Sequence, residues 1–120
     1  MTKLPIKQVS LNEEISIPIV QLELRDNNSI EHLVDDVSCF LSEHLGKSIG
    51  AEVDPDYEQP ITGMSMGDLP SRGYKLTREG EKIGCVAVYH DGKRFEIDLR
   101  EFSADKKDQI RVLQEYLKRF

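Results

Sequence analysis

The chain has few of the residues that mark a disulfide scaffold or a membrane protein. It holds two cysteines in 120 residues, Cys39 and Cys85, and neither belongs to a Cys-x-x-Cys pair or to a Cys/His spacing typical of zinc sites. No segment approaches the run of roughly 20 apolar residues that a spanning helix needs, and the N-terminal stretch lacks the apolar core of a signal peptide. We therefore expect a cytoplasmic protein with reduced thiols and no membrane partner.

Motifs that bind nucleotides or metals, or that carry catalytic serines, are also missing. The sequence contains no Gly-x-Gly-x-x-Gly, no Walker-type loop, no His-Glu-x-x-His and no Gly-x-Ser-x-Gly. The acidic stretch from Glu52 to Glu58 has the carboxylate density of a calcium loop, but it has prolines where such a loop needs a glycine and no closing glutamate at the required spacing. The sequence therefore predicts no cofactor and no metal, and no motif assigns the chain to a family.

Positive charge is in short supply. Sixteen lysines and arginines against twenty-two acidic residues give a net charge of -6, which repels a phosphate backbone and disfavours sequence-independent binding of nucleic acid. The C-terminal third is richer in cations, but acidic residues are interleaved with them. A nucleic-acid accessory protein that uses the C-terminal helix is therefore kept only as an alternative.

Two amphipathic helices are predicted. Ser29 is a suitable N-cap for a helix that runs to about Leu45, with Gly46 as its C-terminal stop, and Ser103 can cap a second helix near the C-terminus. When successive residues are placed about 100° apart, the apolar residues of each helix fall on one arc. That arc is the side expected to dock on a sheet.

The remaining periodic stretches predict strands. A short strand at 6–10 precedes a β-rich stretch at 15–24, in which the alternation changes phase at Pro18, so we expect a bent or bulged edge strand there. Residues 74–99 are typical of three antiparallel strands. Asp91-Gly92 fits a two-residue type I′ turn that pairs Val88 with Phe95.

A second turn, Arg78-Glu79-Gly80, fits a three-residue loop that pairs Thr77 with Glu81 and brings Tyr74 and Leu76 onto the same face as Gly84 and Val86. The order ββαβββα predicts a single α+β domain over residues 1–120. We expect a mostly antiparallel sheet of four to five strands with two helices packed on one face. A long irregular loop is predicted at about 50–72.

The outer face of the predicted sheet, turned away from the helices, carries Ile83, Cys85, Ala87 and Tyr89 on its central strand. The side chains predicted to flank this stripe are mostly charged: Lys75, Thr77, Arg94, Glu96, Asp98 and Arg100. An apolar stripe bordered by charges is typical of a binding patch for a partner protein or for a second copy of the chain. The alternative is that another segment of the chain covers the stripe.

The first helix carries a second candidate. His32, Asp36, Cys39 and Glu43 follow at i, i+4, i+7 and i+11, on the side opposite the core arc. These groups could build a nucleophilic cysteine or a metal site. Residues seven apart on a helix are separated by about 10 Å along its axis, so His32 cannot deprotonate Cys39 directly. A solvated acidic face with one incidental thiol is the favoured interpretation.

The long loop holds Met64 and Met66, flanked by glycines. Methionines in such a segment make adaptable contact surfaces, and they can equally pin the loop onto its own core. The sequence leaves these two alternatives open.

We expect a non-enzymatic protein-binding module, such as an adaptor, a chaperone-like protein or an inhibitor, that uses the outer sheet face and the 51–72 loop. The main alternative is a small hydrolytic enzyme with His90 as general base and Asp91, Glu96 or Asp98 in support. However, Asp91-Gly92 supplies the positive φ of a hairpin turn, so the stretch around His90 is better explained as a hairpin tip. A homodimer remains open, and nucleic acid is disfavoured as a partner.

Overall fold

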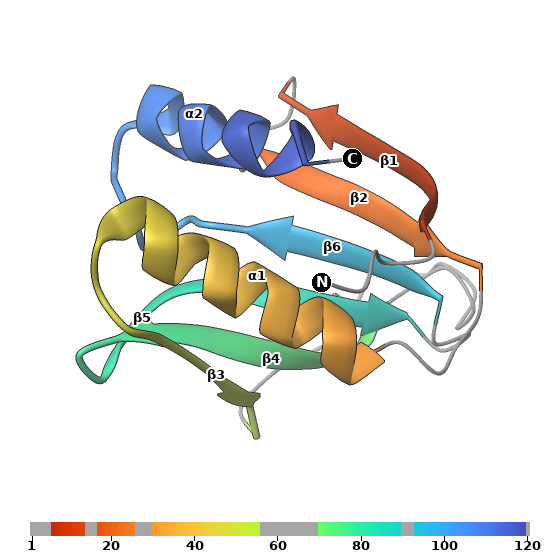
Figure 1. Cartoon of the computed structure of the whole chain (residues 1–120), viewed down its shortest axis with the longest axis horizontal. Coiled ribbons are helices and arrows are strands. Elements are labelled where there is room, and N and C mark those ends of the chain that lie inside the picture. Colours follow the sequence, from red (N-terminus) through yellow and green to blue (C-terminus); the bar gives the residue numbers. More distant parts are fainter. Residues whose placement is uncertain (1–5, 14–16, 26–29, 56–69, 90–92, 120) are drawn as a thin grey trace.

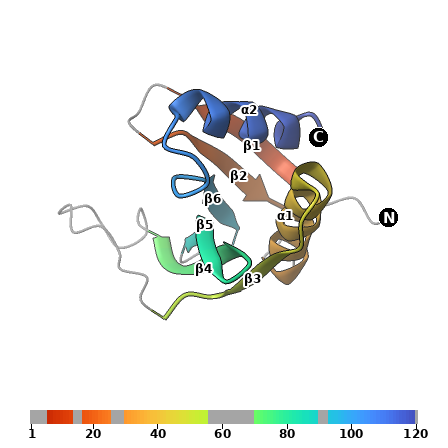
Figure 2. The ribbon, with the colours of Figure 1, turned by 90° about the vertical axis from the view of Figure 1, so that its left-hand side faces the viewer.

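The computed structural model describes residues 6–13, 17–25, 30–55, 70–89 and 93–119. Its elements in chain order are β1 (Ile6–Asn12), β2 (Ile19–Leu24), α1 (Ile30–Leu45), β3 (Ile49–Val53), β4 (Pro70–Arg78), β5 (Glu81–Tyr89), β6 (Arg94–Asp98) and α2 (Lys106–Leu117). The strands form one six-stranded sheet in the order β1-β2-β6-β5-β4-β3, with every neighbouring pair antiparallel. Both helices cover the same face of this sheet (Figures 1 and 2). The α+β class predicted from the sequence is therefore confirmed.

The core lies between the sheet and the two helices. Every second residue of the central strands turns into it, as the two-residue period of a strand requires. The sheet contributes Val20, Leu22, Leu24, Leu76, Val86, Val88, Phe95 and Ile97, and the helices contribute Leu33, Val34, Val37, Leu41, Val112, Leu113 and Tyr116. Burial of these apolar side chains on one face leaves the opposite face of the sheet to polar residues.

Helix α1 has the bounds that its sequence predicts. Leu33, Val37 and Leu41 recur at i, i+4 and i+8 and are buried against the sheet. Gly46 ends the helix with a φ of +69°, a left-handed conformation that glycine adopts without steric cost. Neither helix in the described part of the chain is both long and apolar enough to cross a bilayer.

The cap of α2 differs from the predicted one. Asp105 is the N-cap, and its Oδ1 accepts a hydrogen bond from the Lys107 amide at 2.9 Å. Ser103 lies before the cap and stabilises it. Its hydroxyl accepts a hydrogen bond from the Asp105 amide at 3.1 Å and donates one to Asp108 Oδ2 at 3.1 Å. The assignment of Ser103 as the cap is therefore wrong, because a carboxylate two residues later satisfies the free amide of the first turn.

A polar contact joins the two helices. The Tyr116 hydroxyl donates to Asp36 Oδ2 at 3.0 Å, and Arg119 NH2 lies 2.9 Å from Asp36 Oδ1. The Arg119 guanidinium also sits 5.6 Å from the centre of the Phe40 ring, within cation–π range. Burial, and then the charge of Asp36, raise the pKa of Tyr116, so its hydroxyl stays protonated and can donate. This contact fixes the end of α2 against α1.

The sheet has more strands than the sequence predicts. Ile49–Val53 forms β3, which pairs with β4 inside the stretch expected to be irregular. The prediction of an edge strand at 15–24 is also wrong, because β2 lies between β1 and β6. Pro18 immediately precedes β2 rather than interrupting it, so its missing N–H removes no bond from the ladder.

The two hairpins of the meander differ in how well they match their predicted registers. Strands β5 and β6 pair Val88 with Phe95, as predicted, and the same register pairs Val86 with Ile97. Residues 90–92 between them lie outside the described part of the chain. Between β4 and β5 the predicted three-residue loop is wrong, because Arg78 pairs with Glu81.

The observed turn between β4 and β5 consists of Glu79 and Gly80, with φ of 54° and 85°. Positive φ at both central residues is the requirement of a type I′ turn, which matches the twist of the flanking strands. The register then shifts by one residue, because Thr77 pairs with Lys82 while Leu76 pairs with Gly84. Ile83 is the additional residue on β5.

Gly84 is the position at which this packing is tightest. A Cβ added there would collide with the backbone oxygen of Asp98 and would lie 2.9 Å from Leu99 Cδ2. We predict that Gly84→Ala lowers the free energy of unfolding by roughly 1–3 kcal/mol, because backbone must move to relieve the overlap. Chemical denaturation of wild type and variant measures this change.

Gly50→Ala is the matched control. A Cβ at Gly50 meets only the Thr77 side-chain oxygen at 3.2 Å, on strand β3 at the edge of the sheet. Its midpoint of denaturation should stay close to wild type. Equal midpoints for Gly84→Ala and wild type would show that the contact between β5 and β6 is looser than described here.

Candidate functional site

The sheet face opposite the helices, called the outer face below, holds the candidate site (Figure 2). Strand alternation decides which side chains reach it. On β6, Phe95 and Ile97 are buried in the core, so Arg94, Glu96 and Asp98 turn outward. On β2 the same rule turns Gln21 and Glu23 outward, since Leu22 and Leu24 are buried.

The apolar stripe predicted on β5 is not exposed. Ile83, Cys85 and Ala87 are 3%, 6% and 7% exposed, and Ile83 packs in the core cluster because of the register shift beside it. Cys85 and Ala87 are small and sit opposite the longer side chains of Asp98 and Glu96. These three residues therefore do not form an exposed stripe, and Tyr89 is the member of the stripe that remains half-buried.

A polar pocket of about 210 Å³ opens on the outer face. Its lining consists of Gln8, Ser10, Gln21, Leu22, Glu23, Tyr89, Arg94, Phe95 and Glu96. Leu22 and Phe95 belong to the core face of their strands, which leaves polar side chains as the walls. The pocket spans four adjacent strands, β1, β2, β6 and β5. It therefore depends on residues that are far apart in the sequence.

Tyr89, Arg94 and Glu96 form a contact group at one side of this pocket. The Tyr89 hydroxyl donates a hydrogen bond to Glu96 Oε1. The Arg94 guanidinium carbon lies 4.6 Å from the centre of the Tyr89 ring, well within cation–π range. Both ends of Tyr89 are thus held by neighbours on β6. The structure brings together these three residues, which the sequence had proposed for binding.

Glu96 differs from the other carboxylates of the outer face in its partner. Four other carboxylates form ion pairs, with nitrogen–oxygen distances of 3.2 to 3.4 Å. These pairs are Lys7–Glu23, Lys75–Glu52, Lys82–Asp54 and Arg100–Asp98. The hydrogen-bond partner of Glu96 is the neutral Tyr89 hydroxyl, and no cation of the described residues forms an ion pair with it. Among the described residues the Glu96 carboxylate therefore has no ion-pair partner, although Arg94 lines the same pocket.

Asp98 and Cys85 lie side by side farther along the outer face. Asp98 is 6% exposed, and it accepts bonds from Arg100 Nε at 3.2 Å and NH2 at 3.3 Å, which raise the pKa of the guanidinium. Burial, followed by the charge of Asp98, raises the pKa of the Cys85 thiol to about 11. Cys85 is therefore a neutral thiol at physiological pH, and a nucleophilic role for it is disfavoured.

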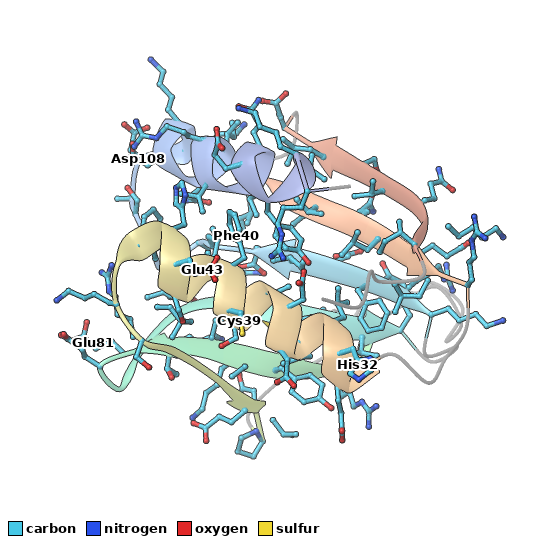
Figure 3. All side chains as sticks on the ribbon, viewed as in Figure 1. His32, Cys39, Phe40, Glu43, Glu81 and Asp108 are labelled. Carbon is cyan, nitrogen blue, oxygen red and sulfur yellow. The ribbon has the colours of Figure 1, made fainter. Side chains whose placement is uncertain are left out.

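The candidate group on α1 is divided by the fold. His32, Cys39 and Glu43 are exposed along the helix (Figure 3), whereas Asp36 contacts Tyr116 of α2 and Arg119, which follows that helix. Because Asp36 serves the contact between the helices, it is not available to orient His32 or to activate Cys39. The arrangement favours a solvated face with an incidental thiol.

Two described residues of the acidic stretch have cationic partners. Glu52 pairs with Lys75 at 3.3 Å and Asp54 with Lys82 at 3.4 Å. Within the described ranges no group of three or more potential metal ligands comes together. Met64, Met66, His90 and Asp91 lie outside the described residues, so their proposed roles stay predictions.

One cation of α2 and one at its C-cap pair with acidic neighbours. Arg111 NH2 lies 2.9 Å from Asp108 Oδ1, and Lys118 Nζ lies 2.8 Å from Glu115 Oε1. Such pairing lowers the net positive field that a phosphate backbone would meet. The nucleic-acid alternative gains no support from this helix.

Sequence reasoning missed Gln8, Ser10, Gln21 and Glu23 as pocket residues. Their outward position follows from strand alternation, but their place beside Arg94 and Glu96 follows from the pairing of β2 with β6. Polar residues recur at every second position within 6–12 and 19–24, and this pattern could have predicted that these side chains face outward.

The two thiols are predicted to differ sharply in reactivity. Cys39 is exposed, and Cys85 is buried with a raised pKa. A thiol reagent at pH 8 should label Cys39 rapidly and Cys85 only after denaturation, as read from the stoichiometry of labelling. Cys39→Ser should abolish the rapid phase, whereas a rapid phase that survives in this variant would show that Cys85 is accessible.

The same pKa shift makes stability depend on alkaline pH. The native state holds the Cys85 proton up to about pH 11, whereas the unfolded chain releases it near its ordinary value of 9.0, so stability should fall between these limits. Thermal melting from pH 8 to 11 should show a smaller loss in Cys85→Ala than in wild type. Identical slopes would contradict the burial of this thiol.

No protein-family model, curated protein or solved structure matches this chain. We therefore infer its function from the geometry of the outer face and its pocket.

Proposed function

We propose that the protein is a non-enzymatic protein-binding module that holds a partner protein against its outer face. The observation that carries this proposal is the polar pocket with Tyr89, Arg94 and Glu96 in mutual contact on one side. Tyrosine and arginine are enriched among the residues that dominate binding energy at protein interfaces. A tyrosine held at both ends also loses little conformational entropy when a partner docks.

The size of the pocket favours a side chain over a substrate. Sites for small molecules and cofactors usually enclose about 300 to 1,000 Å³. A pocket of about 210 Å³ is smaller, and it opens on a sheet face rather than between domains or at the mouth of a barrel. It suits a single side chain that projects from the surface of a partner.

The segment 51–72 is the second part of the proposed surface. It includes Met64 and Met66, which would add adaptable apolar contacts. Among the described residues of this segment, Val53 is 57% exposed, an unusual position for a large apolar side chain. The segment begins on β3, at the opposite edge of the sheet from β1, and ends on β4, where Pro70 pairs with Tyr89 of the pocket.

We predict that Tyr89→Ala weakens capture of the partner by roughly fivefold or more, since truncating an interface tyrosine that acts as a hot spot costs more than about 1 kcal/mol. Immobilised wild type and variants would be incubated with lysate of the source cell, and retained proteins quantified by mass spectrometry. Melting temperatures would verify that each variant is folded. Met64→Asp would test the loop in the same experiment.

Glu43→Gln is the matched control, because Glu43 is exposed on α1, on the opposite side of the molecule from the outer face. It should retain the same protein as wild type. The proposal fails if Tyr89→Ala and Glu43→Gln retain that protein equally, or if wild type retains no protein in a specific and saturable manner.

A further inference from the structure

We propose that the polar pocket receives a lysine or arginine side chain of the partner protein, with Glu96 as its counter-ion. This inference rests on the proposed function and adds the chemistry of the partner. It follows from three features of the pocket: the unneutralised charge of Glu96, the capacity of its carboxylate for further hydrogen bonds, and the direction from which a partner can approach.

The first feature is charge. Glu96 is half-buried, and the described residues supply it with a neutral hydroxyl rather than a cation. Its neighbour Glu23, which also lines the pocket, has Lys7 at 3.2 Å. A partly desolvated carboxylate without a cation is unfavourable in the free protein, and an incoming ammonium or guanidinium would relieve this penalty. An anionic ligand would increase it.

The second feature is hydrogen-bonding capacity. An ionised carboxylate offers about four acceptor sites, and the Tyr89 hydroxyl occupies one of them on Oε1. Gln21 pairs with Glu96 across β2 and β6, and Ser10 pairs with Gln21 across β1 and β2. Gln21 and Ser10 also line the pocket, and their side-chain oxygens are able to accept hydrogen bonds beside the carboxylate. These acceptors suit a group that carries several N–H donors.

Arg94 closes the side of the pocket next to Tyr89. Its guanidinium lies over the ring, and its strand position is opposite Glu23. A carboxylate ligand that approached Arg94 would therefore meet Glu23 on one side and Glu96 on the other. This arrangement disfavours an acidic partner even though the pocket contains a cation.

The third feature is direction. Strand β1 is the sheet edge nearest the pocket, but its register is irregular between Ile6 and Gln8, and it carries Lys7. Irregular pairing and an edge lysine are devices that discourage the addition of another strand. We therefore infer that the partner docks over the outer face and inserts its basic side chain between the strands that line the pocket.

The net charge of the chain also favours a basic partner. A charge of -6 attracts a basic partner over distances of about 8 Å at physiological ionic strength. Association should therefore slow as salt is added, while the contact with Glu96 mainly governs dissociation.

The test uses the full chain and two capped pentapeptides, Gly-Ser-Arg-Ser-Gly and the same peptide with neutral citrulline in place of arginine. Binding is followed by changes in backbone amide NMR shifts. We expect the arginine peptide to shift amides of β2, β5 and β6 around the pocket. It should bind roughly tenfold more tightly than the citrulline peptide, because hydrogen bonds between an ionised donor and an ionised acceptor are stronger than those of a neutral donor.

Glu96→Gln keeps the shape of the side chain and removes its charge, so it should reduce the preference for arginine over citrulline to a ratio of about one. Glu43→Gln should keep the full preference. Equal binding of both peptides to wild type, shifts outside the pocket, or an unchanged preference in Glu96→Gln would each overturn the inference.

The lysate experiment separates this inference from the proposed function. If Tyr89→Ala loses the partner and Glu96→Gln keeps it at wild-type affinity, the outer face binds a protein but does not recognise a cation. If both variants keep the partner, the proposed function itself fails. If both variants lose it while remaining folded, and the peptides behave as expected, both proposals hold.

Discussion

The two-residue alternation of β6, the strand between β2 and β5, is the constraint on which both faces of the molecule depend. Phe95 and Ile97 enter the core beneath the helices, and Arg94 and Glu96 therefore enter the pocket. A slip of one residue would place three charged side chains in the core and two large apolar side chains in water. The burial of Phe95 and Ile97 consequently fixes the positions of Arg94 and Glu96 more firmly than any contact within the pocket.

The helical layer supports the same strands from the other side. The end of α2 is anchored to α1 by Asp36, which accepts from Tyr116 and pairs with Arg119. Helix α2 packs near β1, and α1 packs near β3, so the two edges of the sheet are each tied to a helix. Since Gln8 and Ser10 belong to β1, the helical contact contributes to the position of one pocket wall without touching it.

Local turn chemistry predicted the part of the site that comes from one hairpin. The Asp91-Gly92 pattern predicted the pairing of Val88 with Phe95, which the structure shows, and that register puts Tyr89, Arg94 and Glu96 on the outer face. The pairing of β2 with β6 depends on residues about seventy positions apart, and no local signal states which side of the hairpin β2 joins. Strand β3 was missed for a related reason, because Gly50 and Ala51 have weak strand propensity and gain their order from β4.

Along most of β6 each residue type suits the burial of its position, but Glu96 is a charged residue at a half-buried position. Leucine or glutamine at this position would avoid the partial burial of a charge, and proteins commonly tolerate such a conflict where it serves binding. The neighbouring Asp98 shows how the fold treats a carboxylate that has only a structural role, since Arg100 neutralises it through two guanidinium contacts. The two carboxylates belong to one strand and one face, but Asp98 is 6% exposed whereas Glu96 is half-buried, so solvent screens the charge of Glu96 more than that of Asp98. The cation of the proposed partner would give Glu96 the counter-ion that Arg100 gives Asp98.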